Sequence, residues 1–336
     1  INPDAALSAS YRPSHYAAST APGVFANTCS GFTYVGQSIA WETSPTITLT
    51  GQNVADETTN FSDFHNLFDT NAMAVAMAVN VYQEQTSNDN NSTVTGNDIS
   101  VTVEDSTSFD GALTFAINDQ TFNYVKSATA SLPFESDITL SIPAGALMDV
   151  DGTGVKTSFT ETEFAGVEIA DNAGSQNYYG RLKVESASGS ELDSVSWVAE
   201  VQYYDSVSNV AQWVVNSADT CSVLTESAFT IAGSNEFYLD DTVGYALDES
   251  DTGATTYLLF VDGTDSVTAN GGYITLPFNA PEDIGLIEID VNLSSEQDWL
   301  QFDWDNDGSL DVGMPTTNVL FGRYRGNDRI IFKRER

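Results

Sequence analysis

The sequence predicts an all-β protein of two β-sandwich domains, the first of them immunoglobulin-like. Thr, Ser, Val, Asn, Asp and Gly are abundant, and 32 residues are Phe or Tyr (18 + 14), a composition that favours strands and turns. Short segments of alternating polarity recur roughly every ten residues, which is the spacing of sandwich strands. No 3.6-residue pattern extends beyond about two turns. At 336 residues the chain is too long for one ordinary sandwich.

The first domain, residues 1–165, is expected to begin with a lead-in segment. Residues 1–28 mix Pro, Ser, Ala and aromatic residues without a period. A first series of strands follows, and such immunoglobulin-like domains commonly serve as spacers. Its expected members are Phe32–Val35, Thr46–Thr50, Ala72–Tyr82, Ile99–Glu104, Ala112–Asn118, Phe122–Lys126 and Asp137–Ile142.

The second domain, residues 166–336, is expected to begin within a Gly/Asn/Asp-rich stretch, Phe164–Gln176. Within it, Val195–Tyr204 is apolar at several positions on both faces, which predicts a central strand. The expected strands are Tyr179–Glu185, Val195–Tyr204, Ala211–Val215, Phe229–Ile231, Thr255–Val261, Gly272–Pro277, Ile284–Val291, Leu300–Trp304 and Val319–Arg323.

The charge balance is strongly acidic, with 11 basic against 48 acidic residues and a net charge of −37. Nucleic acids and anionic membrane surfaces require cationic patches, so the composition excludes both as partners. It fits an extracytoplasmic protein in a medium rich in salt and calcium, because cations relieve the self-repulsion of a compact acidic chain. The longest apolar run, Ala72–Val79, is too short to span a bilayer. We therefore expect Ile1 to be a processed end, with an export signal upstream.

One acidic run has the spacing of a calcium loop. Asp303, Asp305 and Asp307 alternate along the chain, and Gly308 follows where a sharp turn is needed. The remaining expected ligands are Asp311 and the backbone carbonyl of Ser309. The loop is no EF-hand, because position 12 is a methionine and the flanking segments read as strands. A solvated acidic turn is the alternative interpretation.

The basic residues and the cysteines leave alternatives open. Six of the 11 basic residues fall in the last 14 positions, among them Arg323, Arg325 and Arg329. They either pair with acidic neighbours in one sheet, which is the simpler interpretation, or form a docking patch for an acidic partner. Cys29 and Cys221 are the two cysteines, and they form either one disulfide or two isolated thiols.

The inventory of catalytic motifs predicts that the chain is not an enzyme. The two histidines, His15 and His65, stand in no Ser/His/Asp or zinc context, and no nucleophile elbow or phosphate loop occurs. A secreted carbohydrate-binding module or carbohydrate-active enzyme is the alternative, since aromatic side chains stack on sugar rings. Candidates for stacking are Trp197, Tyr203, Tyr204 and Trp213, although aromatic residues in sandwiches usually belong to the core. Trp304 is expected on the side of its strand opposite Asp303 and Asp305.

Several motifs, in order along the chain, resemble the C-terminal region of the MshQ family, from the mannose-sensitive haemagglutinin (MSHA) type IV pilus system of Gram-negative bacteria. They are Arg12–Tyr16 (RPSHY), Cys29–Gln37 (CSGFTYVGQ), Tyr179–Val184 (YGRLKV), Asp219–Cys221 (DTC), Phe302–Gly308 (FDWDNDG) and Phe321–Ile331 (FGRYRGNDRII).

This resemblance implies an exported, pilus-associated protein at the cell surface. Its partners would be pilus components such as minor pilins, or a cell or abiotic surface, with glycans as a further option. Two roles compete, that of an adhesin and that of a structural module anchored through the basic end. We favour the structural role, because the basic segment complements an acidic partner and no loop is visibly built as a ligand pocket.

Overall fold

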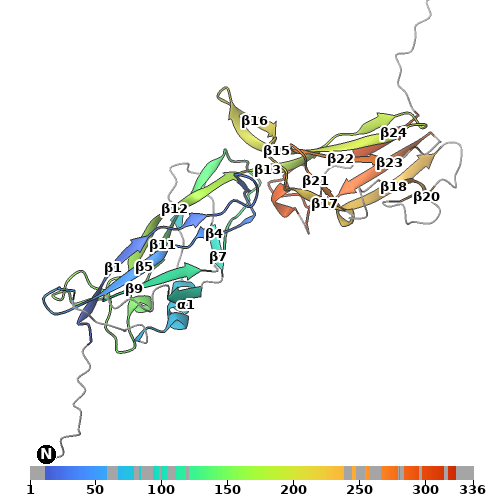
Figure 1. Cartoon of the computed structure of the whole chain (residues 1–336). Helices are drawn as coiled ribbons and strands as arrows, with labels where there is room; N and C mark the ends of the chain where they lie inside the picture. The colour runs from blue at the N-terminus through green and yellow to red at the C-terminus, as the bar shows by residue number, and fades with distance from the viewer. Residues whose placement is uncertain are drawn as a thin grey trace, which may run out of the picture. The chain divides into compact units, whose positions relative to one another are not determined.

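The chain folds into two compact units, one formed by residues 1–125 and 134–177 and the other by residues 126–133 and 178–336. The computed structural model describes residues 12–58, 67–78, 83–84, 94–97, 100–103, 111–118, 121–237, 244–246, 254–257, 266–278, 280, 284–294, 297–313 and 317–322 (Figure 1). The described residues are mostly in strands, which confirms the predicted all-β class. Each unit is described by itself.

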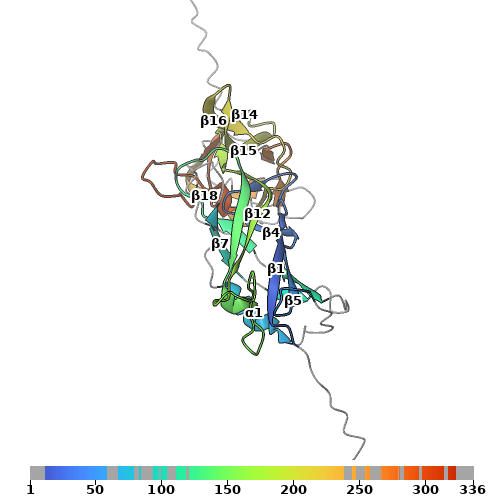
Figure 2. The ribbon, with the colours of Figure 1, turned by 90° about the vertical axis from the view of Figure 1, so that its left-hand side faces the viewer.

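The described residues of the first unit form two sheets. The smaller has the order β1-β5-β9-β8, formed by His15–Ala21, Thr46–Gln52, Ala112–Asn118 and Ser100–Val103. The larger has the order β6-β11-β12-β2-β4-β10-β7, formed by Gln83–Glu84, Phe134–Ile142, Val167–Tyr178, Val24–Phe25, Ser38–Thr43, Thr121–Tyr124 and Val94–Asn97, and β3 (Thr33–Tyr34) also pairs with β12. Figure 2 shows β1 and β12 running lengthwise through this unit.

One hydrophobic core joins these two sheets. Ile47 and Phe115 enter it from the smaller sheet, and Phe122 and Ile138 enter it from the larger one; all four are fully buried. Burial of side chains of this size stabilises the fold by about 1.5 to 3 kcal/mol each. The arrangement is therefore a sandwich, while the immunoglobulin-like topology of this domain stays a prediction.

Two expectations for the first unit were wrong. The expected strand Ala72–Tyr82 is a helix over its described part, because α1 spans Thr70–Ala78 and is built from Ala and Met, which favour helices. Asp69 caps it by accepting hydrogen bonds from the backbone N–H groups of Asn71 and Ala72, at 3.0 and 3.1 Å. The expected lead-in includes β1, which pairs with β5 over its whole length. A short 3₁₀ helix, η2, spans Ala144–Leu147.

The second unit is also built from two main sheets. One has the order β13-β15-β16, formed by Gly180–Val184, Val195–Val207 and Val210–Val215, with β22 (Tyr273–Phe278) also paired to β15. The other has the order β14-β24-β23-β18, formed by Ala187–Gly189, Thr317–Phe321, Gly285–Val291 and Phe229–Phe237. Smaller elements are β17 (Val223–Thr225), β21 (Ser266–Thr268), β19 (Gly244–Ala246), β20 (Ala254–Tyr257), η3 (Glu226–Ala228) and η5 (Asp298–Leu300).

Aromatic contacts close the core between these two sheets. Trp197 on β15 is fully buried, packs edge-on against Phe229 at 5.4 Å, and donates its Nε1–H to Thr317 Oγ1 at 3.2 Å. Phe278 on β22 meets Phe321 on β24 at 6.3 Å. Strand β15 has hydrogen-bonded neighbours on both sides, which confirms the predicted central strand.

The boundary between the units lies later than expected. The stretch Phe164–Gln176, where the boundary was expected, contains part of β12, which pairs with β11 of the first unit. Residues 166–177 therefore belong to that unit. The Gly, Asn and Asp residues of this stretch form an irregular strand and not a linker. Asp171 and Gly174 have positive φ values of 59° and 117°, and the buried side chain of Asn172 donates to the carbonyl oxygens of Ile138 and Ile169.

Candidate functional site

The acidic run of the second unit folds into a tight loop after η5. An isolated bridge between Phe302 and Asp311 closes the loop, so the expected strand Leu300–Trp304 is absent. The chain turns at Asn306 and Gly308, with φ values of 60° and 91°. A positive φ is well tolerated by glycine and Asn. These turns place three carboxylates together, because one oxygen each of Asp303, Asp305 and Asp307 lies within 4.8 Å of the others.

Backbone N–H groups line the inside of this loop. The buried carboxylate of Asp303 accepts from the N–H groups of Asp307 and Gly308, at 3.1 and 3.0 Å. Asp305 also accepts from Asp307, at 3.0 Å. Hydrogen bonds from the hydroxyl and the N–H of Ser309 lower the pKa of Asp307. The Asp307 carboxyl group is thus held in a position that favours its ionised form.

One of the expected ligands has another partner. The Asp311 carboxylate accepts a hydrogen bond from the N–H of Trp304 at 2.6 Å, and it is not part of the three-carboxylate group. The hydroxyl of Ser309 donates to Asp307, while the role of its backbone carbonyl as a ligand stays a prediction. The loop therefore presents Asp303, Asp305 and Asp307 as a set of hard oxygen donors, which is the donor type that Ca²⁺ takes. The same hydrogen bonds would hold a solvated acidic turn, so both interpretations remain.

Beside this loop, a guanidinium group is packed among aromatic rings. Arg181 of β13 lies 4.0 Å from the centre of the Trp213 ring on β16, and 5.2 and 5.0 Å from the rings of Phe302 and Trp304. Its Nε–H donates to Gln202 at 2.9 Å. Burial lowers the pKa of Arg181 to about 10, against the opposing effect of the Glu200 carboxylate.

Sequence reasoning missed this cluster. The side chain of Trp304 packs edge-on against Phe302 at 5.2 Å, as part of the aromatic group. Tyr204 also belongs to this group, at 5.3 Å from Trp213. The four rings come from β15, β16 and the acidic loop, which are far apart in sequence. The one available signal was the alternation of aromatic and acidic residues around Trp304.

A half-buried lysine lies at the base of the loop. Lys126 belongs to the second unit, and its Nζ donates to the carbonyl oxygens of Gly180, at 2.6 Å, and Trp299. It also lies 4.5 Å from the centre of the Tyr179 ring. Burial lowers the pKa of Lys126 well below its ordinary value, although the Asp298 carboxylate acts in the opposite direction. Lys126 thereby attaches the segment 126–133 to β13 and to η5, the short helix that precedes the acidic loop.

Comparison with protein families assigns almost the whole chain. Domain models of DUF6701 match it twice, the third domain over residues 11–174 and the fourth over residues 178–336. The chain belongs to the DUF6701 family. The junction between the two domains coincides with the end of β12, where the structure also divides.

Other comparisons add little to this assignment. The DUF6701 chain matches no protein of curated function. A solved structure of the Yersinia pseudotuberculosis adhesin InvE is similar at 11% identity over 91% of this chain and 58% of that chain, with a TM-score of 0.28. A likeness at this level supports no conclusion about fold or function. Among the described residues, no helix is both long and apolar enough to cross a membrane.

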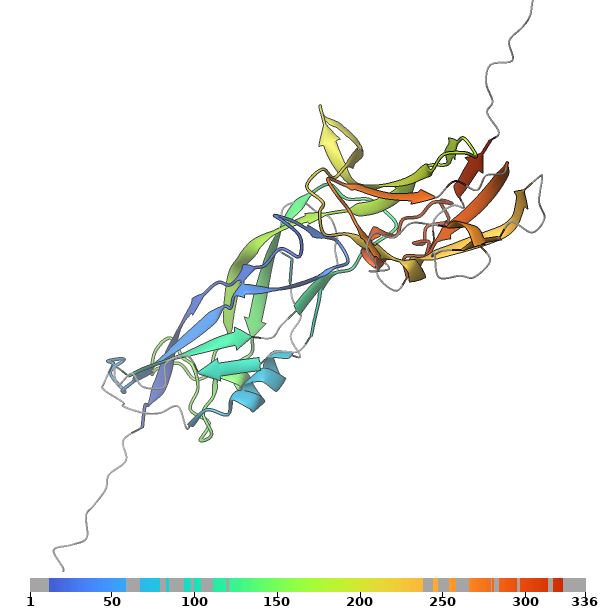
Figure 3. The ribbon, with the colours of Figure 1, turned by 45° about the vertical axis from the view of Figure 1, so that its right-hand side comes forward.

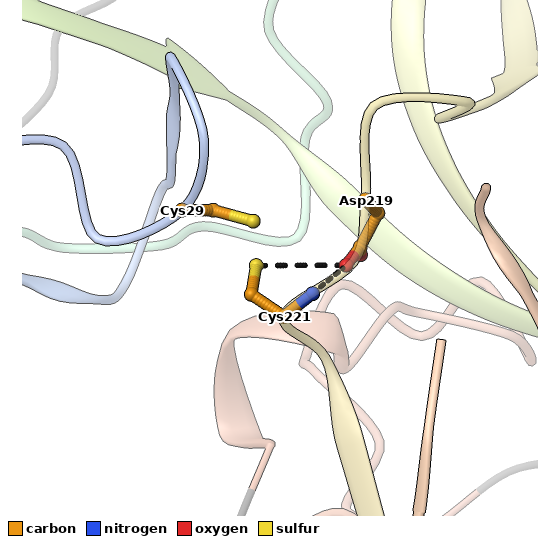
Figure 4. Close-up of side chains that lie close together, drawn as sticks. All are labelled: Cys29, Asp219 and Cys221. Carbon is orange, nitrogen blue, oxygen red and sulfur yellow. Dashed lines mark hydrogen bonds between the residues drawn. The ribbon is translucent and has the colours of Figure 1, made fainter. Parts of the chain in front are cut away.

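Both cysteines of the DUF6701 chain are disulfide-bonded, and neither is free. Figure 4 draws them with Asp219. The buried carboxylate of Asp219 accepts from the N–H groups of Cys221 and Ser222, at 3.0 and 2.9 Å, and from the Ser222 hydroxyl at 2.7 Å. These bonds fix the turn that carries Cys221. Oxidised sulfurs are not thiolate ligands, so this group is not a metal site.

The remaining candidates are either structural or beyond the described residues. Trp197 belongs to the core, and Tyr203 stacks on Tyr178 at 4.6 Å. His15 is fully buried on β1 with its Nε2 atom 3.2 Å from Asp56 Oδ1, consistent with a structural role. The basic residues Arg323, Arg325 and Arg329, and also His65, lie outside the described residues.

Proposed function

We propose that this chain is a non-enzymatic, extracellular structural module of a pilus-associated surface protein, stabilised by calcium. The observation that carries the proposal is the convergence of Asp303, Asp305 and Asp307 within 4.8 Å in a chain of net charge −37. Three carboxylates this close repel one another, and a divalent cation removes that repulsion. An acidic, calcium-stabilised sandwich suits a protein exposed to an ion-rich medium.

The pilus association rests on the sequence resemblance to the MshQ family. Under this proposal the module is exported from a Gram-negative bacterium and anchors to pilus components such as minor pilins. The anchoring element is the basic end that contains Arg323, Arg325 and Arg329, because it is the one strongly cationic segment of an acidic chain. Adhesion to a cell or abiotic surface would then be a property of the assembled protein.

A carbohydrate-binding surface is the second candidate. Tyr204, Trp213, Phe302 and Trp304 form a continuous row of half-buried rings beside the acidic loop. Aromatic rings next to a calcium site provide both stacking and oxygen coordination for a sugar. Binding of the purified chain to a glycan array, lost in Trp304→Ala, would favour this candidate. Hydrolysis of the bound glycan would favour a carbohydrate-active enzyme instead.

The deciding experiment removes the basic anchor. Arg323, Arg325 and Arg329 are replaced together by Ala, and the fold is checked by circular dichroism. Loss of co-purification with pilus components, with the fold intact, is the expected result. Intact co-purification combined with lost surface attachment would assign this chain an adhesin role and overturn the structural one.

A further inference from the structure

The hairpin of β15 and β16 extends beyond the rest of its sheet. Figure 3 shows it projecting from the body of the second unit. Val207 and Val210 face each other across a two-residue turn, in which Ser208 and Asn209 have φ values of 55° and 62°. Positive φ at both positions is the signature of a type I′ turn. A two-stranded hairpin is only marginally stable in water on its own. A further strand that pairs with one of its outer edges would therefore stabilise it.

The hydrogen bonds show which groups point away from the hairpin. Tyr204 donates its backbone N–H to Tyr179 on the far side of β15, so the pair of Tyr204 and Trp213 is not hydrogen-bonded within the hairpin. The next pair of this kind is Ser206 and Ala211, because such pairs alternate along an antiparallel ladder. The backbone groups of Ala211 and Trp213 therefore point outward from β16.

The two outer edges of the hairpin differ in whether their outward backbone groups are hydrogen-bonded. On the β15 side, the outward N–H of Ser206 is satisfied by the Asp205 carboxylate at 2.7 Å. On the β16 side, no described residue is hydrogen-bonded to the outward groups of Ala211 or Trp213. The strand reads VAQWVV, without the Lys, Pro or β-bulge that usually protects an edge. Val210 is 61% exposed at its start.

We propose that the open edge of β16 accepts residues 323–336 of a second copy of this chain as an added strand. Charge complementarity selects this occupant. The chain as a whole has a net charge of −37, and the charged residue of the hairpin, Asp205, is acidic, whereas the terminal segment contains six of the 11 basic residues. That segment also includes Arg329–Lys333 (RIIFK), whose β-branched and aromatic residues favour a strand.

This inference rests on the proposed role of the basic end as an anchoring element, and it adds a second copy of the chain to the partners of that element. Edge and terminal segment are different surfaces of one molecule, so the contact is heterologous, and a pair joined by one such contact keeps one free edge and one free segment. Copies that continue to join head to tail form open chains or rings, whereas two copies that exchange segments reciprocally form a closed dimer. Open chains would extend a surface structure without additional proteins.

Sedimentation velocity of the whole chain at increasing concentration tests the proposal. The full chain should form species larger than the monomer, and a chain that ends at Gly322 should stay monomeric. A peptide of residues 323–336 should dissociate the larger species, and the same peptide with Ile330→Pro, which keeps every charge, should not. Self-association that persists without the terminal segment, or equal activity of both peptides, would overturn the proposal.

A matched pair of variants locates the contact on β16. Ala211→Pro removes one outward N–H and should weaken association at least about fivefold, the loss of one hydrogen bond. Ala211→Val keeps that N–H and should associate as the unchanged chain does. Equal association of the two variants would contradict the edge assignment. Loss of self-association with intact binding to pilus components would separate this inference from the proposed function.

Discussion

Arg181 joins three elements of the second unit through its side chain. Its guanidinium contacts a ring on β16 and two rings of the acidic loop, and its Nε–H is bonded to Gln202 on β15. A partly desolvated cation over aromatic faces is stabilising, and the aliphatic stem adds packing. The contacts of Arg181 thereby attach the acidic loop to the sheet of β13, β15 and β16, whereas the bridge between Phe302 and Asp311 closes the loop itself.

Replacement of Arg181 should therefore destabilise the second unit. We expect Arg181→Ala to lower the free energy of unfolding by about 2 kcal/mol. Arg181→Lys keeps the charge but lacks the planar group that stacks on the rings. It should therefore retain only part of the free energy of unfolding that Arg181→Ala loses. Urea unfolding followed by tryptophan fluorescence measures both, since Trp213 and Trp304 lie against the guanidinium. Unchanged stability of the Ala variant would contradict the proposed attachment.

Tyr203 predicts a dependence of stability on alkaline pH. Burial, together with the hydrogen bond and charge of Asp205, raises the pKa of Tyr203 from 10.0 to about 12. The folded chain therefore holds this proton in a range where the unfolded chain has lost it. The stabilisation is fully present below pH 10 and is lost as the pH rises towards 12. Tyr203→Phe should reduce this loss in denaturation curves measured across that range; a slope unchanged in Tyr203→Phe would refute this assignment.

At the scale of single residues, the sequence predicted that three carboxylates converge but not what surrounds them. The spacing of Asp303, Asp305 and Asp307 is local, and a local turn brings those side chains together. Arg181 and its rings come from separate strands, so only the tertiary fold determines their contact. The Asp311 carboxylate was assigned to the same group, yet the bridge to Phe302 places it against the N–H of Trp304.

Helix α1 is an element that the sequence pattern predicted incorrectly as a strand. Its segment is an apolar run without clear alternation, and periodicity alone does not separate a buried strand from a helix in such runs. Asp69 was the overlooked signal, because an Asp before an Ala-rich run is a helix N-cap. Most strands were predicted because alternation is preserved where one face is buried, as in β5 and β23.

The cap of α1 provides a test at the scale of the element. Asp69→Ala removes the acceptor for two backbone N–H groups and should lower the free energy of unfolding by about 1 kcal/mol. Asp69→Asn is the matched control, since it retains an oxygen acceptor and should cost less. Chemical denaturation followed by far-ultraviolet circular dichroism compares the two. Equal losses would show that charge at the helix start, and not the cap, is responsible.

At the scale of the whole molecule, we propose that Cys29 and Cys221 are bonded to each other. They are the chain's two cysteines and both are oxidised. In the chain-entropy account, a bond that closes a loop of this size stabilises the fold by up to about 5 kcal/mol. Reduction, or Cys221→Ser, should therefore lower the unfolding free energy by several kcal/mol. Alkylation of either cysteine in the unreduced, denatured monomer would refute the bond.

With a net charge of −37, we expect the chain to be stabilised by bound cations that reduce the repulsion among its carboxylates. Thermal unfolding in excess Ca²⁺ and in chelator measures this stabilisation. Saturation a hundredfold above the dissociation constant should add about 2.7 kcal/mol of stability and raise the melting temperature accordingly. Asp305→Ala should abolish the shift, whereas Asp193→Ala, at an exposed carboxylate outside the loop, should keep it. A melting temperature indifferent to calcium, or a full shift in Asp305→Ala, would contradict the account.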